Sequence, residues 1–203
     1  VSAKGENNPE TVPERLIRAL IAGKHGSPFE HNAFTFFAEA PIFVFREWQR
    51  HRAGSFNEMS GRYTQLLPKF YIPAHDRPVV NEGTKMRPDF VFSHEDEAAG
   101  FREELKHQSS NAWLTYEDAL ADSIAHEVAR MVLPVNVYSQ MYWTVNARSL
   151  MNFLSLRVES DDSAVRSYPQ LEIQLGAMQV EALFAGLMPL THAAFVANGR
   201  VAP

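Results

Sequence analysis

The sequence predicts an α+β fold with a single domain over residues 1–203. The 203 residues are 45% hydrophobic and 21% charged, which is typical of a soluble globular protein of this length. Segments with apolar residues at helical spacing alternate with short aromatic segments of high β propensity. No internal repeat, low-complexity stretch or linker in the sequence divides the chain into two domains.

The first half of the chain combines one strand, two helices and long irregular connections. Residues 1–10 are polar, and we expect them to be frayed. Leucine and isoleucine at helical spacing predict a helix from Thr11 until glycine and proline interrupt it near Gly23. Residues 33–40 predict a strand, and Pro41 suits the first position of a helix that continues to about His51. The remaining segments predict a loop over 53–61, an extended stretch over 63–72 and an irregular excursion over 74–92.

The second half is mostly helical around one strand. Ser93 followed by Asp96 resembles a capping box before a long polar helix over 94–120, and helical character continues over 117–131. Alternation over 135–145 predicts a strand with every second side chain on one face, and 146–157 predicts a helix. After a loop over 158–168, Pro169 opens a last helix that Pro189 ends. Its apolar stripe is expected to pack against another helix and consists of Leu171, Leu175, Met178, Ala182 and Ala185.

Composition excludes several classes of protein and site. The net charge is −5, whereas general nucleic-acid binders are usually basic, so we expect no nucleic-acid partner. The sequence has no cysteine, which excludes disulfides, Fe–S clusters, thiolate zinc sites and a cysteine nucleophile. Residues 1–10 lack the apolar core of a signal peptide, and the longest uncharged run, 131–147, is too short and too polar to span a membrane. We therefore expect a cytoplasmic protein without a membrane partner.

The densest chemical signal is a basic cluster between Arg46 and Arg62. Its centre is Arg50-His51-Arg52, which is followed after seven residues by Ser60. Arginine side chains bind phosphate with two parallel hydrogen bonds, and a flexible Ser-Gly pair offers further donors to an anion. The alternative interpretation is a solvated basic turn, because most charged runs are simply exposed surface.

A second signal lies on the helix predicted over 146–157. Arg148 and Asn152 are four residues apart and so adjacent on the helix. Asn146 and Arg157 are eleven residues apart, about three turns, so that Asn146, Asn152 or Phe153, and Arg157 fall near one side. Amide and guanidinium groups beside apolar residues are suited to the rim of a site for a polar, planar ligand. The alternative is an ordinary solvated helix face.

Metal chemistry is a weaker hypothesis. His25, Glu30 and His31 lie close in sequence and could serve a metal-dependent hydrolase, but their spacing matches no standard zinc signature. His126-Glu127 begins like a zinc-protease motif, which fails because Arg130 occupies the position of the second histidine. The sequence also lacks the glycine-rich dinucleotide loop, the phosphate-binding loop and the serine nucleophile motif. We therefore expect no metal.

Taken together, these segments resemble the flavin-dependent thymidylate synthases. The family signature is RHR followed by seven residues and serine, which here is Arg50-His51-Arg52 and Ser60. Matching blocks occur in the family's usual order between about residues 25 and 175. They are HGSPFEH at 25–31, PIFVFREWQRHR at 41–52, NEMSGRY at 57–63, ARMVLP at 129–134 and NARSLMNFLSLR at 146–157.

The resemblance implies a complete reaction. Members of this family convert dUMP to dTMP, with methylenetetrahydrofolate as carbon donor, FAD as hydride carrier and NADPH as the reductant of the flavin. It also implies a central, mostly antiparallel sheet flanked by long helices, and a homotetramer whose active sites lie where subunits meet. A non-catalytic nucleotide- or flavin-binding protein on the same scaffold is the alternative.

The resemblance also implies roles for individual residues. Those expected to contact the flavin are Ser27, Arg50, His51, Arg52, Glu58, Asn146, Ala147, Arg148 and Asn152. One part of the dUMP site is expected at Glu47, Trp48, Gln49 and Arg50, and another, donated by a neighbouring subunit, at Glu58, Met59, Ser60, Gly61 and Arg62. Arg130 is expected to bind dUMP as well, and Arg157 to polarise the uracil ring, so that no thiolate is needed.

The sequence departs from the family pattern in two respects. The family commonly has a histidine four residues after the arginine at position 157, whereas this sequence has Asp161. One flavin contact is therefore expected to differ. Family members usually begin with a strand before the first helix, but residues 1–10 predict none.

Overall fold

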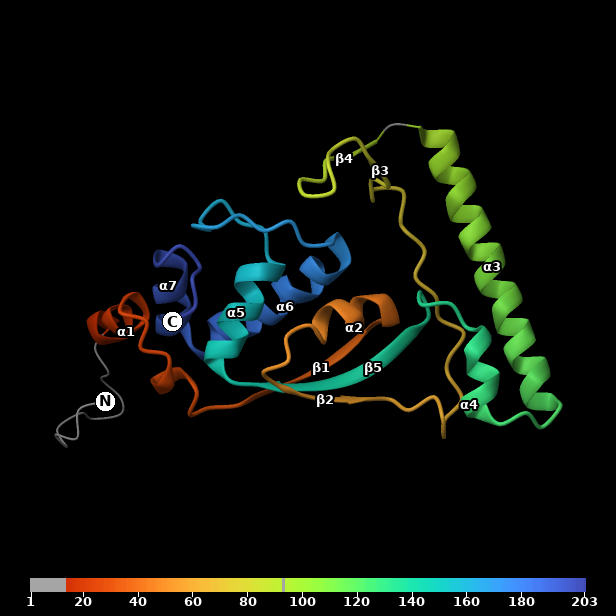
Figure 1. The fold of residues 1–203 in the computed structure, drawn as a ribbon, viewed down its shortest axis with the longest axis horizontal. Helices are drawn as coiled ribbons and strands as arrows, with labels where there is room; N and C mark the ends of the chain where they lie inside the picture. The colour runs from red at the N-terminus through yellow and green to blue at the C-terminus, as the bar shows by residue number, and fades with distance from the viewer. Residues whose placement is uncertain (1–13, 93) are drawn as a thin grey trace. The chain divides into compact units, whose positions relative to one another are not determined.

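The computed structural model describes residues 14–92 and 94–203 and confirms the predicted α+β class (Figure 1). The predictions for residues 1–10 and for the cap at Ser93 lie outside the described residues. The chain forms two compact units. Within the described residues, unit 1 contains 14–36, 50–56 and 143–203, and unit 2 contains 37–49, 57–92 and 94–142. The assignment of one domain to the whole chain stays a prediction.

A three-stranded sheet has the order β1 (Phe34–Pro41), β5 (Tyr138–Val145) and β2 (Ser55–Glu58). Strands β1 and β5 are antiparallel, because Thr35 meets Thr144 while Glu39 meets Gln140. The predicted alternation in β5 is confirmed: every second side chain from Ser139 to Val145 is buried. The strand begins at Tyr138, three residues later than predicted.

The prediction of a loop over 53–61 was wrong in its middle, where β2 forms. This short segment pairs with the central strand, and the Met59 amide just beyond it donates to the Gln140 carbonyl at 2.8 Å. Phe56 stacks on Trp143, with ring centroids 6.3 Å apart. Tertiary pairing therefore orders a segment whose glycine, serine and asparagine content indicates a loop.

Unit 1 consists mostly of helices that pack on one another. Its helical elements are α1 (Glu14–Ala22), the 3-10 turn η2 (Ser27–Phe29), α5 (Ala147–Arg157), α6 (Leu171–Leu187) and α7 (Pro189–Ala197). Helix α7 packs against both α1 and α6, and α5 packs against α6. The helices predicted from Thr11 and over 146–157 are confirmed within the described residues.

The last predicted helix differs in its buried face. Ile173, Ala177 and Phe184 of α6 are fully buried, whereas Leu175 and Met178 of the predicted stripe are 51% and 50% exposed. Apolar residues lie on several sides of this helix, so the periodicity alone could not select the inward face. Pro189 ends α6 as predicted, but it also occupies the first position of α7, which the sequence analysis missed.

Unit 2 is built around the longest helix. Its elements are α2 (Ile42–Trp48), β3 (Val80–Asn81), β4 (Phe90–Val91), α3 (Glu95–Ala121), α4 (His126–Ala129) and the 3-10 turn η3 (Arg130–Val132). Pro41 ends β1 and is the N-cap of α2, so the helix begins one residue later than predicted. It ends at Trp48, and the predicted continuation to about His51 was wrong. The long helix over 94–120 is confirmed, and a break separates it from α4. The strands β3 and β4 pair antiparallel inside the predicted irregular excursion.

Buried polar contacts fix α3 to the extended segment. The Asn136 amide donates to the Tyr71 carbonyl and to Ser109 Oγ, both at 3.0 Å. Arg102, which is 7% exposed, donates to the carbonyls of Pro73 and Arg77 at 3.1 and 3.0 Å. Because buried donors are costly without partners, these bonds hold the segment in one position.

Candidate functional site

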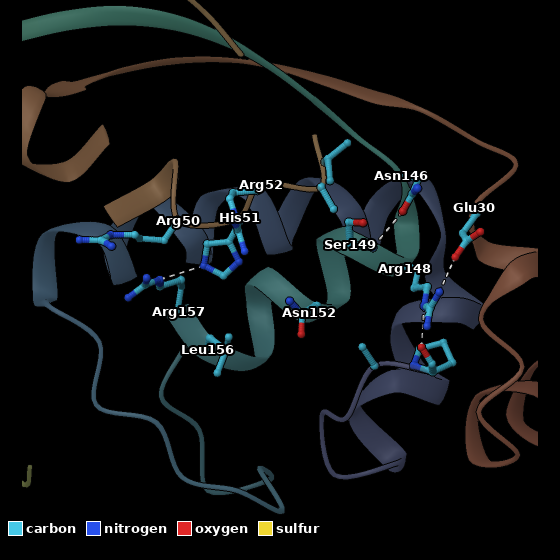
Figure 2. Close-up of a pocket in the computed structure, with 14 residues that line it drawn as sticks. Glu30, Arg50, His51, Arg52, Asn146, Arg148, Ser149, Asn152, Leu156 and Arg157 are labelled. Carbon is cyan, nitrogen blue, oxygen red and sulfur yellow. Dashed lines mark hydrogen bonds and ion pairs between the residues drawn. The ribbon is translucent and has the colours of Figure 1, made fainter. Parts of the chain in front are cut away.

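A cavity of about 750 Å³ opens in unit 1, and we call it the arginine cavity (Figure 2). The segment 50–53, the helix α5, Glu30 just after the turn η2 and the last residues of the chain all contribute to its wall. The lining residues are Glu30, Arg50, His51, Arg52, Ala53, Val145, Asn146, Arg148, Ser149, Asn152, Leu156, Arg157, Ala202 and Pro203. The structure thus brings the basic motif and the predicted polar face of α5 into one site.

The start of α5 is fixed by two asparagine side chains. Asn146 is the N-cap residue, and its Oδ1 accepts from the Ser149 amide at 2.9 Å. Asn32 Oδ1 accepts from the Ala147 amide at 2.7 Å. These bonds satisfy backbone donors that a helix start leaves unpaired. They set the rotation of α5, so that Arg148, Asn152 and Arg157 all reach the cavity.

The segment 50–53 lies close to the central strand because Gly54 has no side chain. A Cβ at Gly54 would lie 2.8 Å from Trp143 Nε1 and 2.9 Å from the Thr144 carbonyl. No real Cβ tolerates such distances, so glycine permits this approach. The His51 ring then meets Phe153 of α5 edge to face, with centroids 4.9 Å apart.

His51 and Arg157 form a direct hydrogen bond within the cavity. Arg157 Nε donates to His51 Nε2 at 3.1 Å, as Figure 2 shows. Burial, together with the positive charge of Arg157, lowers the pKa of His51 from 6.5 to about 4. The imidazole is therefore neutral at neutral pH.

Arg148, at the N-terminal end of α5, forms hydrogen bonds with two partners. Its Nη1 donates to Glu30 Oε1 at 2.5 Å and its Nε to the Pro203 backbone oxygen at 2.9 Å (Figure 2). Gly26 makes room for the guanidinium, since a Cβ there would lie 2.5 Å from Arg148 Nε.

The charge of the arginine cavity favours an anionic ligand. Four arginines line it, and Glu30 is the one acidic residue among the described residues of its wall. Arginine forks recognise phosphate and the edges of polar rings, and Asn152 adds amide groups. The volume falls in the usual range for cofactor and substrate sites. The cavity can thus hold a large anionic molecule with a planar, hydrogen-bonding ring.

Unit 2 contains a second cavity of about 280 Å³, which we call the Glu58 cavity. Four predicted dUMP residues line it: Glu58, Met59, Gly61 and Arg130. The other lining residues are Ile42, Arg46, Leu66, Glu127, Met131, Leu133, Val135, Val137 and Ser139. The Glu58 cavity therefore joins the segment after β2 to the turn η3.

Comparison with known proteins decides the family. A family model described as thymidylate synthase complementing protein matches residues 2–190. A flavin-dependent thymidylate synthase from Streptomyces coelicolor is 50% identical over 210 aligned residues, covering 100% of this chain and 85% of that protein. The chain belongs to the family of flavin-dependent thymidylate synthases.

Further relatives agree with this assignment. A flavin-dependent thymidylate synthase from Tropheryma whipplei is 53% identical over 188 residues, which cover 93% of this chain and 78% of that protein. A crystal structure of the UMP/dUMP methylase PolB from Streptomyces cacaoi, bound with 5-Br UMP, has a TM-score of 0.89 at 45% identity. It covers 94% of this chain and 85% of the PolB chain. The fold of the family and the resemblance noted in the sequence are thereby confirmed.

Several residues to which the family resemblance assigns a role lie outside the two cavity walls. Ser27 is exposed in η2, and Ala147 is fully buried at the start of α5. Trp48 is buried against Phe45, with ring centroids 6.5 Å apart. The remaining ones are Glu47, Gln49, Ser60 and Arg62. Their predicted contacts with ligand stay predictions.

The polar residues outside the two cavity walls form hydrogen bonds or ion pairs with neighbouring side chains or backbone. Gln49 Nε2 donates to Glu58 Oε2 at 3.4 Å, and Ser60 Oγ accepts from the Arg62 amide at 3.3 Å. Arg62 Nε forms an ion pair with Glu127 at 2.7 Å, so Glu127 connects the segment after β2 to α4.

The sequence analysis assigned no ligand role to some cavity residues. Glu30 was considered for metal only, and it pairs with Arg148 instead. Arg46 was counted in the basic cluster without a role, and it lines the Glu58 cavity together with Ser139. The basic cluster could have pointed to Arg46, but no sequence signal indicates Ser139. Asp161, which departs from the family pattern, is exposed and lies outside both walls.

In residues 14–92 and 94–203, no three His, Cys, Asp or Glu side chains gather closely enough to bind a metal ion. None of the helices in the same ranges has both the length and the apolar character needed to cross a bilayer.

Proposed function

We propose that the chain is a flavin-dependent thymidylate synthase that methylates dUMP to dTMP, with methylenetetrahydrofolate as carbon donor and NADPH as the source of reducing equivalents. The observation that carries this proposal is the wall of the arginine cavity. There the RHR motif, Asn152 and Arg157 surround one space, although the motif and the helix are distant in sequence. Family membership and the similarity to a UMP/dUMP methylase support the same reaction.

FAD fits the residues of the arginine cavity. Arg50, Arg52 and Arg148 supply positive charge for a pyrophosphate, and Asn152 supplies amide groups for a polar ring. When bound, FAD would supply the hydride chemistry, which no protein side chain provides. The protein's share is to hold the ring system and exclude other orientations.

Arg157 is the residue that we assign to the activation of uracil. The sequence contains no cysteine, so addition of a protein thiolate to uracil C6 is not available. A guanidinium against the N3/O2 edge would stabilise negative charge on the ring and raise electron density at C5. The hydrogen bond from Arg157 to His51 restrains this guanidinium before any substrate arrives.

The Glu58 cavity supports the second part of the dUMP site. It gathers Glu58, Met59, Gly61 and Arg130, which the family resemblance assigns to the nucleotide. We propose that this part completes the site of a neighbouring subunit in a homotetramer. Arg46 is a further cation of the same wall and is available to the phosphate.

A visible absorption spectrum and a turnover assay test the proposed function. The purified protein, or protein supplied with FAD, should show flavin absorption bands that shift on addition of dUMP. dTMP should form when dUMP, methylenetetrahydrofolate and NADPH are all present, and omission of any one should stop it. Protein that binds no FAD, or binds it and forms no dTMP under these conditions, contradicts the proposal.

Substitution of Gly26 by alanine should weaken flavin binding with little effect on stability. The new Cβ would displace the Arg148 guanidinium, which is the flexible end of an exposed side chain. We expect the Kd for FAD to rise about tenfold, equivalent to ~1.4 kcal/mol, in a fluorescence titration. Gly186→Ala is the matched control, since a Cβ there meets nothing within 4 Å. Equal FAD affinity in the two variants would show that Arg148 contributes nothing to the site.

A further inference from the structure

We propose that His51 is the positioning residue of Arg157, which it holds as a neutral imidazole whose hydrogen is on Nδ1. The consequence for substrate rests on the proposed function, but the state of the imidazole does not. The role differs from the flavin contact that the family resemblance implies for His51. In this role, the middle residue of the RHR motif affects the substrate through Arg157 and not by direct contact.

The chemistry of the two partners fixes the tautomer. Arg157 Nε carries a hydrogen at all accessible pH values and has no acceptor. The His51 Nε2 that lies 3.1 Å from it must therefore accept, so Nε2 carries no hydrogen. In neutral histidine the hydrogen is then on Nδ1. Protonation would turn the acceptor into a donor facing a cation, and the hydrogen bond would be lost.

The packing of His51 makes this bond a restraint on Arg157. Phe153 is fully buried and contacts both the His51 ring and Trp143, each with centroids 4.9 Å apart. Phe153 and Arg157 are four residues apart on α5, so they lie on the same face of the helix. The imidazole thus packs against the buried Phe153 ring and accepts a hydrogen bond from Arg157, one helical turn further along.

Burial and the charge of Arg157 keep His51 neutral. Arg50 and Arg52 flank it in the chain, and Arg157 and Arg148 reach the same cavity from α5. Glu30, just after η2, is the acidic residue of the described wall, and its carboxylate is paired with Arg148. The pKa of His51 is lowered by burial first and by the charge of Arg157 second.

Nitrogen NMR of the histidine rings tests the tautomer directly. We expect the ligand-free protein, labelled with ¹⁵N-histidine, to show for His51 a hydrogen on Nδ1 and no titration between pH 5.5 and 8. His51→Gln assigns the signal by its loss, and His31→Ala assigns an exposed histidine for comparison. A hydrogen on Nε2, or titration near pH 6.5, would overturn the proposal whether or not the protein makes dTMP.

A double-substitution series tests the coupling to Arg157. His51→Ala should raise the Kd for dUMP about tenfold in the flavin-loaded protein, and it should have no further effect when Arg157 is already alanine. His51→Gln, whose amide oxygen can accept from Arg157 Nε, should restore affinity to within threefold. Flavin absorbance identifies any loss of FAD in each variant. Independent effects of the two alanine substitutions, or equal losses in the Ala and Gln variants, would refute a positioning role.

Discussion

Replacement of Arg157 by alanine should lower the rate of dTMP formation by about 10²–10³-fold, the usual cost of removing one preorganised group that stabilises developing charge. The substitution removes the guanidinium that we assign to the uracil edge. FAD should remain bound, because Arg50, Arg52 and Arg148 still line the arginine cavity. Rapid-quench measurement of dTMP, together with the flavin absorbance of the same sample, separates the two effects.

Arg166→Ala provides the matched control for Arg157. Arg166 lies just beyond α5 and forms an exposed ion pair with Glu159 at 2.6 Å. Exposed pairs contribute little to stability, so this variant should turn over at the wild-type rate. Arg157→Lys keeps the charge but loses the planar fork, and we expect it to recover at most a small part of the rate. An Arg157→Ala protein that kept more than a tenth of the wild-type rate would contradict the assigned role. If the wild-type protein bound flavin but formed no dTMP, the non-catalytic alternative would be favoured.

Local patterns in the sequence predicted the elements that carry the site. The alternation of β5 and the helical pattern of α5 are properties of single segments, and both elements formed within the predicted ranges. β2 could not be predicted in this way, because its order comes from pairing with a strand far along the chain. The inward face of α6 depends on its neighbours, so Leu175 and Met178 were wrongly placed inside.

The same distinction applies to the site. From the sequence, helical spacing pairs Arg148 with Asn152 one turn along, and it places Asn152 and Arg157 near one side. Glu30 pairs with Arg148 across 118 residues, and the Pro203 oxygen reaches it across 55. Such pairs depend on how helices pack, and they cannot be predicted from a single sequence. The bond between His51 and Arg157 spans 106 residues and was missed for the same reason.

Substitution of Glu181 by glutamine should destabilise unit 1 by about 3 kcal/mol, because it removes one partner of a buried ion pair. Arg200 is 5% exposed and binds both carboxylate oxygens of Glu181, each at 2.7 Å. His192 Nε2 donates to the same carboxylate at 2.8 Å. This network joins α6 to α7 and to the segment after it. We expect thermal unfolding roughly 6–12 °C lower for a chain of this size.

The contribution of Glu181 should also depend on pH. Burial alone raises the pKa of this carboxyl, but hydrogen bonds from Arg200 and His192 and their charges outweigh burial, so its pKa lies below 4.5. A carboxyl with a lowered pKa in the folded protein stabilises it fully above pH 4.5. That stabilisation is lost as the pH falls through the folded pKa. The stability difference between wild type and variant should therefore narrow at acid pH.

Glu159→Gln is the control that distinguishes loss of the Glu181 network from loss of one negative charge anywhere on the protein. It removes the same charge from the exposed pair with Arg166, where water screens the interaction, so unfolding should change by less than about 1 kcal/mol. Urea unfolding of both variants at pH 7 and at a series of decreasing pH values below 4.5 makes the comparison. If the two substitutions cost the same, the carboxylate of Glu181 adds no more than a surface charge. A larger cost for Glu181→Gln that persists unchanged as the pH falls well below 4.5 would instead assign the effect to packing, because protonation of the wild-type carboxylate would then remove nothing.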